Sequence, residues 1–198
     1  MAPFGQVVPV TGPLTGFPGK ISRLGERVVR AAQVLSTTPN NINFGDPVVI
    51  IPTSGGGDTI VSVKDYVGTG TGQQSGTMTA AKLAGFAIAE VETMLTFPGT
   101  LTAPTNQNGY YAPGLMAEFL ERGSLTVTIN NGTPASQGQV YVRVTANASF
   151  PNGVVGGLEA SVSDSGSNCI ALTGVVFRTG VLDSNNNAEI TILSRPAA

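Results

Sequence analysis

The sequence contains no histidine, no tryptophan and one cysteine, and charged residues make up only 11% of the chain. A disulfide framework needs paired cysteines and a structural zinc site needs four Cys or His ligands, so both are excluded. The absence of histidine also excludes hydrolases that use a histidine base. The formal net charge of -2 argues against a protein that binds nucleic acid by neutralising phosphates. We therefore expect a structural protein and not an enzyme, with no catalytic residues, no metal and no cofactor.

Long hydrophobic runs are also missing from the sequence. No segment approaches the roughly 18 apolar residues of a membrane span, so we expect no membrane partner. The start of the chain, MAPFGQVVPVTGPLTGFPGK, lacks the basic region and apolar region of a secretory signal. Together with the single cysteine, this start predicts synthesis in a reducing cytoplasm.

What the chain does contain is 26 glycines, 13 prolines and 41% hydrophobic residues in a length of 198. Short apolar runs recur between turn residues, which indicates a folded, loop-rich protein and not a disordered one. We predict an all-β sandwich or barrel. The predicted strands lie near residues 46–51, 60–63, 84–89, 124–129, 139–145, 169–177 and 188–193.

A few segments depart from this simple pattern. The run Leu115–Arg122 (LMAEFLER) predicts a short helical turn, and the glycine-rich residues 68–79 predict a mobile loop. Residues 81–97 suit either a helix or strands, and we favour strands. The pair Asn131–Gly132 signals a hairpin or tight loop before the next strand.

The two halves of the β region resemble each other. NFGDPVVI (43–50), LAGFAI (83–88) and GSLTVTI (123–129) match SQGQVYVR (136–143), LTGVVF (172–177) and AEITIL (188–193) in the same order. These matches predict an internal duplication of residues 43–129 and 136–193. Each half would then be a small β unit, and the two similar units would pack together.

The N-terminal region differs in composition from the rest of the chain. Residues 1–19 are rich in proline and glycine but carry scattered apolar side chains, which predicts an extended arm. The arm either lies in a groove on a partner or straps the protein's own core. Residues 20–30 hold four of the ten basic residues, spaced for one face of a helix or alternating along a strand. We divide the chain into an arm and basic segment at residues 1–40 and a β domain at 41–198.

Several motifs have simple structural explanations. The glycine-rich segments at 54–58 and 68–72 lack the Lys-Ser/Thr of a phosphate-binding loop. Glu90 and Glu92 predict an exposed strand face, Asp164 and Asp183 predict Asx turns, and Cys169 predicts a buried small side chain.

A family resemblance emerges from motifs spread over residues 20–195. NFGDPVVI, AAKLAGFAIAEVET, GYYAPG, LERGSLTVTI, GQVYVRV and ALTGVVFRTGVLDSNNNAEITIL, in this order, resemble the structural cement, or head decoration, proteins of tailed bacteriophages. The resemblance implies a β-rich oligomer that binds the outer surface of the phage head, with synthesis in the host cytoplasm. It implies the major capsid protein as a partner, neighbouring subunits of which the protein ties together, and no enzymatic residues.

Charge and composition suggest which residues make these contacts. The basic stretch is suited to an acidic partner surface, and adjacent aromatics in a Pro/Gly loop are suited to an interface. The candidate capsid or subunit contacts are Phe4, Phe17, Lys20, Arg23, Arg27, Arg30, Tyr110 and Tyr111. Self-assembly is expected because loops hold apolar side chains, with a trimer favoured over a dimer. The alternative function is a carbohydrate-binding or adhesin β module of a tail fibre.

Overall fold

The computed structural model describes residues 16–23, 25–53, 57–89, 109–162 and 168–194. These residues form strands and very little helix, which confirms the all-β prediction. The elements are β1 (Val28–Val34), β2 (Ile42–Asn43), β3 (Pro47–Pro52), β4 (Asp58–Ser62), α1 (Val63–Val67), the 3-10 helix η1 (Ala80–Lys82), β5 (Leu83–Ala87), β6 (Tyr110–Tyr111), β7 (Met116–Asn131), β8 (Gln139–Arg143), β9 (Leu158–Glu159), β10 (Cys169–Phe177) and β11 (Asn187–Ile192).

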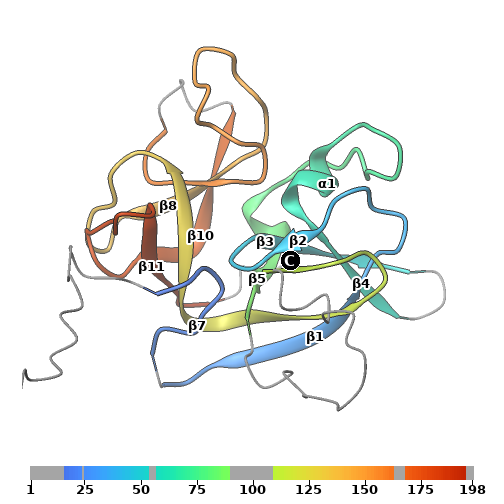
Figure 1. Cartoon of the computed structure of the whole chain (residues 1–198), viewed down its shortest axis with the longest axis horizontal. Helices are drawn as coiled ribbons and strands as arrows, with labels where there is room; N and C mark the ends of the chain where they lie inside the picture. Colours follow the sequence, from blue (N-terminus) through green and yellow to red (C-terminus); the bar gives the residue numbers. More distant parts are fainter. Residues whose placement is uncertain (1–15, 24, 54–56, 90–108, 163–167, 195–198) are drawn as a thin grey trace, which may run out of the picture.

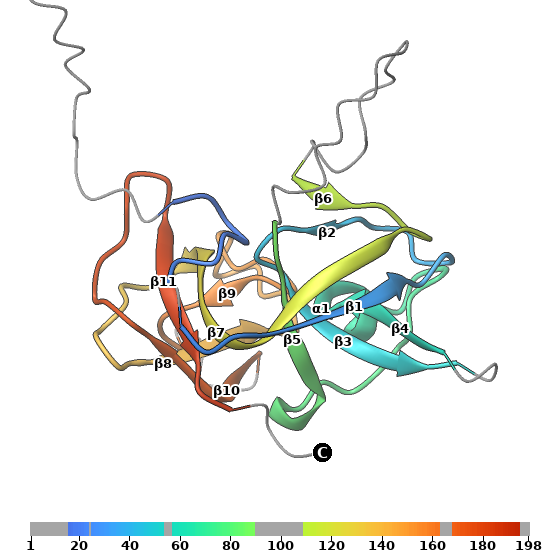
Figure 2. The same cartoon turned by 90° about the horizontal axis from the view of Figure 1, so that it is seen from below.

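The strands close into two small barrels that share β7. In the first barrel the order is β1-β4-β3-β5-β7, and β7 pairs back to β1. In the second barrel the order is β7-β11-β10-β8-β9, and β9 pairs back to β7. Figures 1 and 2 show the two barrels as neighbouring lobes, with β7 running from one into the other. A separate pair, β2 and β6, lies against the first barrel.

The two barrels have the same connectivity. Taken in chain order, β1, β3, β4, β5 and β7 of the first correspond to β7, β8, β9, β10 and β11 of the second. Each of the five pairings has a counterpart of the same sense: β1–β4 and β7–β9 are parallel, and the other four in each barrel are antiparallel. The segments matched in the sequence fall on corresponding strands, as a duplication requires. The duplication itself stays a prediction.

The pairing partners of the long strand β7 change at Gly123. Residues 116–122 pair with β1 and partly with β5, whereas residues 123–128 pair with β11. Gly123 has a φ of 130°, a backbone conformation that residues with a Cβ atom rarely adopt. A glycine at this position therefore lets one strand leave the first barrel and enter the second.

Two apolar clusters fill the structure. One draws side chains from all five strands of the first barrel together with Ile42 and Tyr111 of the β2–β6 pair. The other fills the second barrel and continues onto the opposite face of β3, β4 and β5. Neighbours along β3 therefore enter different clusters: Val48 enters the first and Val49 the second. Burial on both faces explains why DPVVIIP is a continuous apolar run.

Strand pairing overrides the helical predictions. Residues 116–122, expected in a helical turn, form the first half of β7, because both of its edges are occupied, by β1 and by β5. The helical alternative for the basic segment is also wrong for residues 28–34, which form β1. Near the end of β1, the buried residues Ala32 and Val34 alternate with exposed residues, as in a strand. Leu, Ala and Glu favour helices only weakly, and tertiary pairing readily outweighs that preference. β1 also lies within the predicted N-terminal segment 1–40 and is a strand of the first barrel.

Other local predictions are corrected or confirmed. Asn131–Gly132 does not begin a hairpin, because β7 and β8 are not neighbours in the sheet. The strand expected near residues 60–63 is present as β4, which ends at Ser62; the Ser62 hydroxyl accepts from the Asp65 N–H and caps α1. Residues 68–79 form an irregular loop after α1, and their mobility is not tested. Asp183 forms the expected Asx turn, and Cys169 is buried as expected. Glu90, Glu92 and Asp164 lie outside the described residues.

A buried ion pair lies in the second barrel. The guanidinium of Arg143 and the carboxylate of Glu159 are both 0% exposed and are joined by hydrogen bonds of 2.5 and 3.1 Å. The Cys169 thiol donates to the same carboxylate at 3.4 Å. Such a pair offsets its own desolvation cost only while both charges are present.

Removing one partner of this pair should therefore destabilise the protein strongly. We expect Arg143→Met to lower the free energy of unfolding by about 3 kcal/mol or more, because it leaves a buried carboxylate unpaired. The double variant Arg143→Met/Glu159→Leu should recover part of the loss. Denaturant unfolding of both variants tests this, and a single variant as stable as the original chain contradicts it.

Candidate functional site

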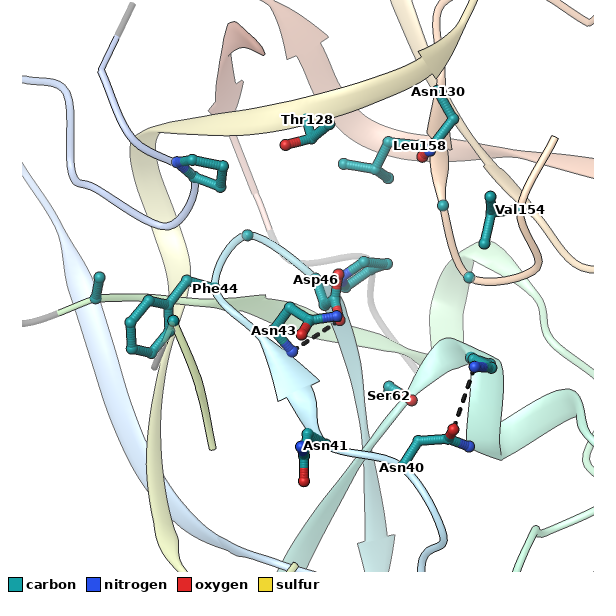
Figure 3. Close-up of a pocket in the computed structure, with 18 of the residues that line it drawn as sticks. Asn40, Asn41, Asn43, Phe44, Asp46, Ser62, Thr128, Asn130, Val154 and Leu158 are labelled. Atoms are coloured by element: carbon teal, nitrogen blue, oxygen red, sulfur yellow. Dashed lines mark hydrogen bonds between the residues drawn. The ribbon is translucent and has the colours of Figure 1, made fainter. Parts of the chain in front are cut away.

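A groove of about 1000 Å³ lies between the two barrels. Figure 3 shows Asn43, Phe44 and Asp46 of the first barrel on one side and Thr128, Leu158 and Val154 of the second on the other. The described lining residues are Phe17, Pro18, Lys20, Asn40, Asn41, Asn43, Phe44, Gly45, Asp46, Pro47, Ser62, Lys64, Ala89, Gly109, Thr128, Asn130 and residues 154–158. The groove therefore combines residues of both barrels with residues of the N-terminal segment.

The described lining of the groove is rich in amides and apolar side chains. Among the lining residues that the structure describes, the ionisable side chains are two lysines and one aspartate, and the other polar side chains are mainly asparagine amides. Lys64 is engaged with the Asn40 side chain at 3.2 Å. Within the described residues, no three His, Cys, Asp or Glu side chains are grouped so that they could hold a metal ion. Amides and apolar side chains together fit an uncharged polypeptide surface.

Asp46 is the one acidic side chain among the described residues that line this groove. Its Oδ2 accepts hydrogen bonds from the Asn43 backbone N–H at 2.9 Å and from the Asn43 side-chain amide at 3.1 Å. Burial raises the pKa of Asp46 to about 6, although the Asn43 hydrogen bonds and the nearby Lys64 act in the opposite direction. The folded protein therefore binds a proton here more tightly than the unfolded chain does.

The segment Gly16–Arg23 straps the junction of the barrels. The Gly19 N–H donates to the Thr126 carbonyl at 2.8 Å, and the Thr126 N–H donates to the Lys20 carbonyl at 2.9 Å. Ile21 forms a bridge with Leu125 of β7. On the side of the first barrel, the Ala89 N–H donates to the Gly19 carbonyl at 2.9 Å. Gly19 has a φ of 78° and leaves no room for a side chain beside Phe44, so glycine is required there.

Two of the predicted contact arginines are engaged within the chain. Arg23 donates to both carboxylate oxygens of Glu189 on β11, at 2.6 and 3.0 Å, and this interaction holds the pKa of Glu189 below its usual value. Arg30 pairs with Glu121 at 3.1 Å and with Asp58 at 3.5 Å. Arg23 thus links the N-terminal segment to β11, and Arg30 links β1 to β7 and β4. The sequence pattern does not indicate these distant partners.

The remaining predicted residues divide between core and surface. Tyr111 is buried, donates from its hydroxyl to the Ile88 carbonyl at 2.7 Å, and packs edge-on against Phe44. Tyr110 is half-buried beside it. Lys20 and Arg27 are exposed and form no ion pair with any residue that the structure describes. Phe17 is 80% exposed at the groove. Phe4 lies outside the described residues.

Sequence reasoning missed two parts of the groove. The turn over residues 40–46 was read only as the start of the β region, although its three asparagines are a polar cluster that the sequence displays. The segment over residues 154–158 carries no motif that predicts a site. Nothing in either segment indicated that folding would bring them to face each other.

The pKa of Asp46 predicts a pH dependence of stability. Because the folded-state pKa is raised, this carboxyl weakens folding as the pH rises from about 4 to above 6, where it is charged. Asp46→Asn, which keeps an oxygen to accept from Asn43, should raise the free energy of unfolding by about 1–2 kcal/mol at pH 7.5 and by little at pH 4. Denaturant unfolding of the variant and the original chain at both pH values measures this. An equal effect of Asp46→Asn at both pH values contradicts the assignment.

Comparisons with known proteins identify the family. The model of the family described as "Structural cement protein (E217 gp24/Pam3 gp6)" matches residues 5–193. Among solved structures, a chain from "The capsid of Myoviridae Phage XM1" is similar in fold, with a TM-score of 0.54 and 18% sequence identity over 97% of this chain and 98% of that one. The search of curated proteins gives no match. Because the family model covers nearly the whole sequence, this chain belongs to the structural cement proteins of phage capsids.

Proposed function

We propose that this chain binds the outer surface of a phage head as a homo-oligomer and ties adjacent major capsid subunits together. Membership in the structural cement family is the observation that carries the proposal. The chain is a capsid-stabilising structural protein of the virion. We further propose that it lies on the outer surface, is made in the host cytoplasm and forms a trimer in preference to a dimer. We also propose that the chain has no enzymatic activity.

The two-barrel body is suited to bridging. The barrels share β7 and one continuous apolar cluster, so a load applied to one barrel is transmitted to the other through main-chain hydrogen bonds and packed side chains. We propose that the junction lies over the boundary between two capsid subunits. Each barrel would then contact a different subunit.

Exposed cations near the junction are the proposed electrostatic contact. Lys20 and Arg27 flank the segment that crosses the barrels, and neither is paired with a described acidic residue. Arg23 and Arg30 remain partly exposed, and we propose that they contribute less to this contact because they also pair with Glu189 and Glu121. An acidic capsid surface would attract the two available cations and orient the protein as it docks.

Charge reversal at these two positions tests the contact. Lys20→Glu/Arg27→Glu should weaken binding to undecorated heads about tenfold at low salt, with a smaller effect at high salt because screening reduces the attraction. The measurement is occupancy of purified heads by gel densitometry across a concentration series. Exposed Lys82→Glu on η1 is the control and should bind normally.

The outcomes separate the proposed contact from the proposed function. If the double variant decorates heads as well as the original chain, the electrostatic contact is wrong. If the original chain binds no heads, and binds bacterial glycans instead, the cement function is wrong and the adhesin alternative is supported.

A further inference from the structure

Three polar side chains meet where helix α1 lies beside the connection between β1 and β2. The Lys64 Nζ donates to the Asn40 Oδ1 at 3.2 Å (Figure 3), and the Asn40 Nδ2 donates to the Asp65 Oδ1 at 2.5 Å. The oxygen end of one amide thus meets an amine, and its nitrogen end meets a carboxylate. The proposed capsid contact makes no use of this arrangement.

Asp65 is the unusual member of the group. It is 0% exposed, and its Oδ2 has no hydrogen-bond partner within the part of the chain that the structure describes. A buried carboxylate oxygen without a donor costs free energy, so each such oxygen in a native structure needs an explanation. A buried carboxylate that touches an amide and has one oxygen left to accept a proton is suited to proton transfer.

The surrounding structure holds the carboxylate and the amide in place. The Gln73 side-chain amide donates to the Asp65 Oδ1 at 3.3 Å, and the Gln74 N–H donates to the Asp65 carbonyl at 2.9 Å. A Cβ atom at Gly72 would collide with the Thr37 carbonyl oxygen, so the loop after α1 packs directly on the connection that carries the asparagine. The reacting groups are therefore positioned before any reaction begins.

The amine of Lys64 lies near the carbon that it would attack. Because a C=O bond is about 1.23 Å long, the hydrogen-bond distance places Nζ no more than about 4.4 Å from the Asn40 Cγ. Reacting atoms in near-attack geometries are about 3–3.5 Å apart. The lysine side chain is exposed, and its flexible stem can cover the remaining distance by rotation.

We propose that Lys64 and Asn40 form an isopeptide bond within the chain, with Asp65 as the catalytic residue. The Lys64 ammonium gives one proton to water, and the neutral amine attacks the Asn40 Cγ to form the Nζ–Cγ bond. Asp65 takes the proton that Nζ then loses and returns one to Nδ2, the Cγ–Nδ2 bond breaks, and ammonia leaves. One amide replaces another, so the reaction balances without an oxidant, a reductant or a co-reactant.

The bond would fasten the connection between β1 and β2 to α1 independently of strand pairing. It is a single event within one chain and not an enzymatic turnover. A cross-link of this kind stabilises a fold chiefly because it restricts the unfolded chain. The proposal goes beyond the capsid function and does not depend on it.

Mass spectrometry of the purified full chain tests the bond. After incubation at mildly alkaline pH, where more of the amine is neutral, the intact mass should be about 17 Da below the sequence mass because ammonia is lost. A proteolytic digest should contain a branched peptide in which Lys64 is joined to Asn40. Lys64→Arg should abolish the branched peptide and the loss of mass. Lys82→Arg, the same change at an exposed lysine on η1, is the matched control and should keep both.

Two further measurements separate the chemistry from a loss of folding. Asp65→Asn keeps the shape of the side chain but removes the proton acceptor, and it should slow formation of the branched peptide about 100-fold, with circular dichroism to confirm the fold. Thermal melts compare the linked chain with a surface variant: the original chain should have a Tm about 5 °C or more above that of Lys64→Arg. Lys82→Arg should melt like the original chain.

Three results would overturn the proposal. The first is an original chain that keeps its full mass and gives no branched peptide. The second is a loss of ammonia that persists in Lys64→Arg, which would place the loss in a succinimide elsewhere in the chain. The third is a folded Asp65→Asn variant that forms the bond as fast as the original chain.

Discussion

Strand β7 belongs to both barrels, and the pairing of its two halves determines how the rest of the chain is arranged. Its first half accepts β1 and β5, its second half accepts β11, and Gly123 marks the change. The segment from Gly19 to Val34 runs antiparallel along β7, pairing first with the second barrel and then with the first. Two neighbouring, hydrogen-bonded segments, β7 and the N-terminal segment, therefore run from one barrel to the other. They join the two small barrels into one body.

The few charges of this protein mostly stabilise that body. Arg23 binds Glu189 across the junction, Arg30 binds Glu121 on β7, and Arg143 binds Glu159 in the core of the second barrel. In a protein with only 11% charged residues, these pairs engage three of the arginines within the chain. This distribution agrees with a cement protein whose attachment depends on shape and apolar contact, with a small electrostatic contribution from exposed cations.

The strands could be predicted because alternation, β-branched residues and turn glycines act locally, as in DPVVIIP at β3. The matched segments on β3, β5 and β7 also indicated two similar units. The failures share one physical cause. The helical reading of LMAEFLER rested on local preference, whereas β1 and β5, from distant parts of the sequence, occupy both edges of that segment. The partners of Arg23 and Tyr111, and the groove itself, likewise depend on contacts between residues far apart in the chain.

The central claim is that one rigid two-barrel body bridges adjacent capsid subunits. A cryo-EM reconstruction of heads saturated with the protein tests it most directly. The account predicts that both barrels appear on the outer surface at equal density, each over a different major capsid subunit, in a closed oligomer about a symmetry axis. Density for a single barrel, both barrels over the same subunit, or protein on the inner surface would contradict the account.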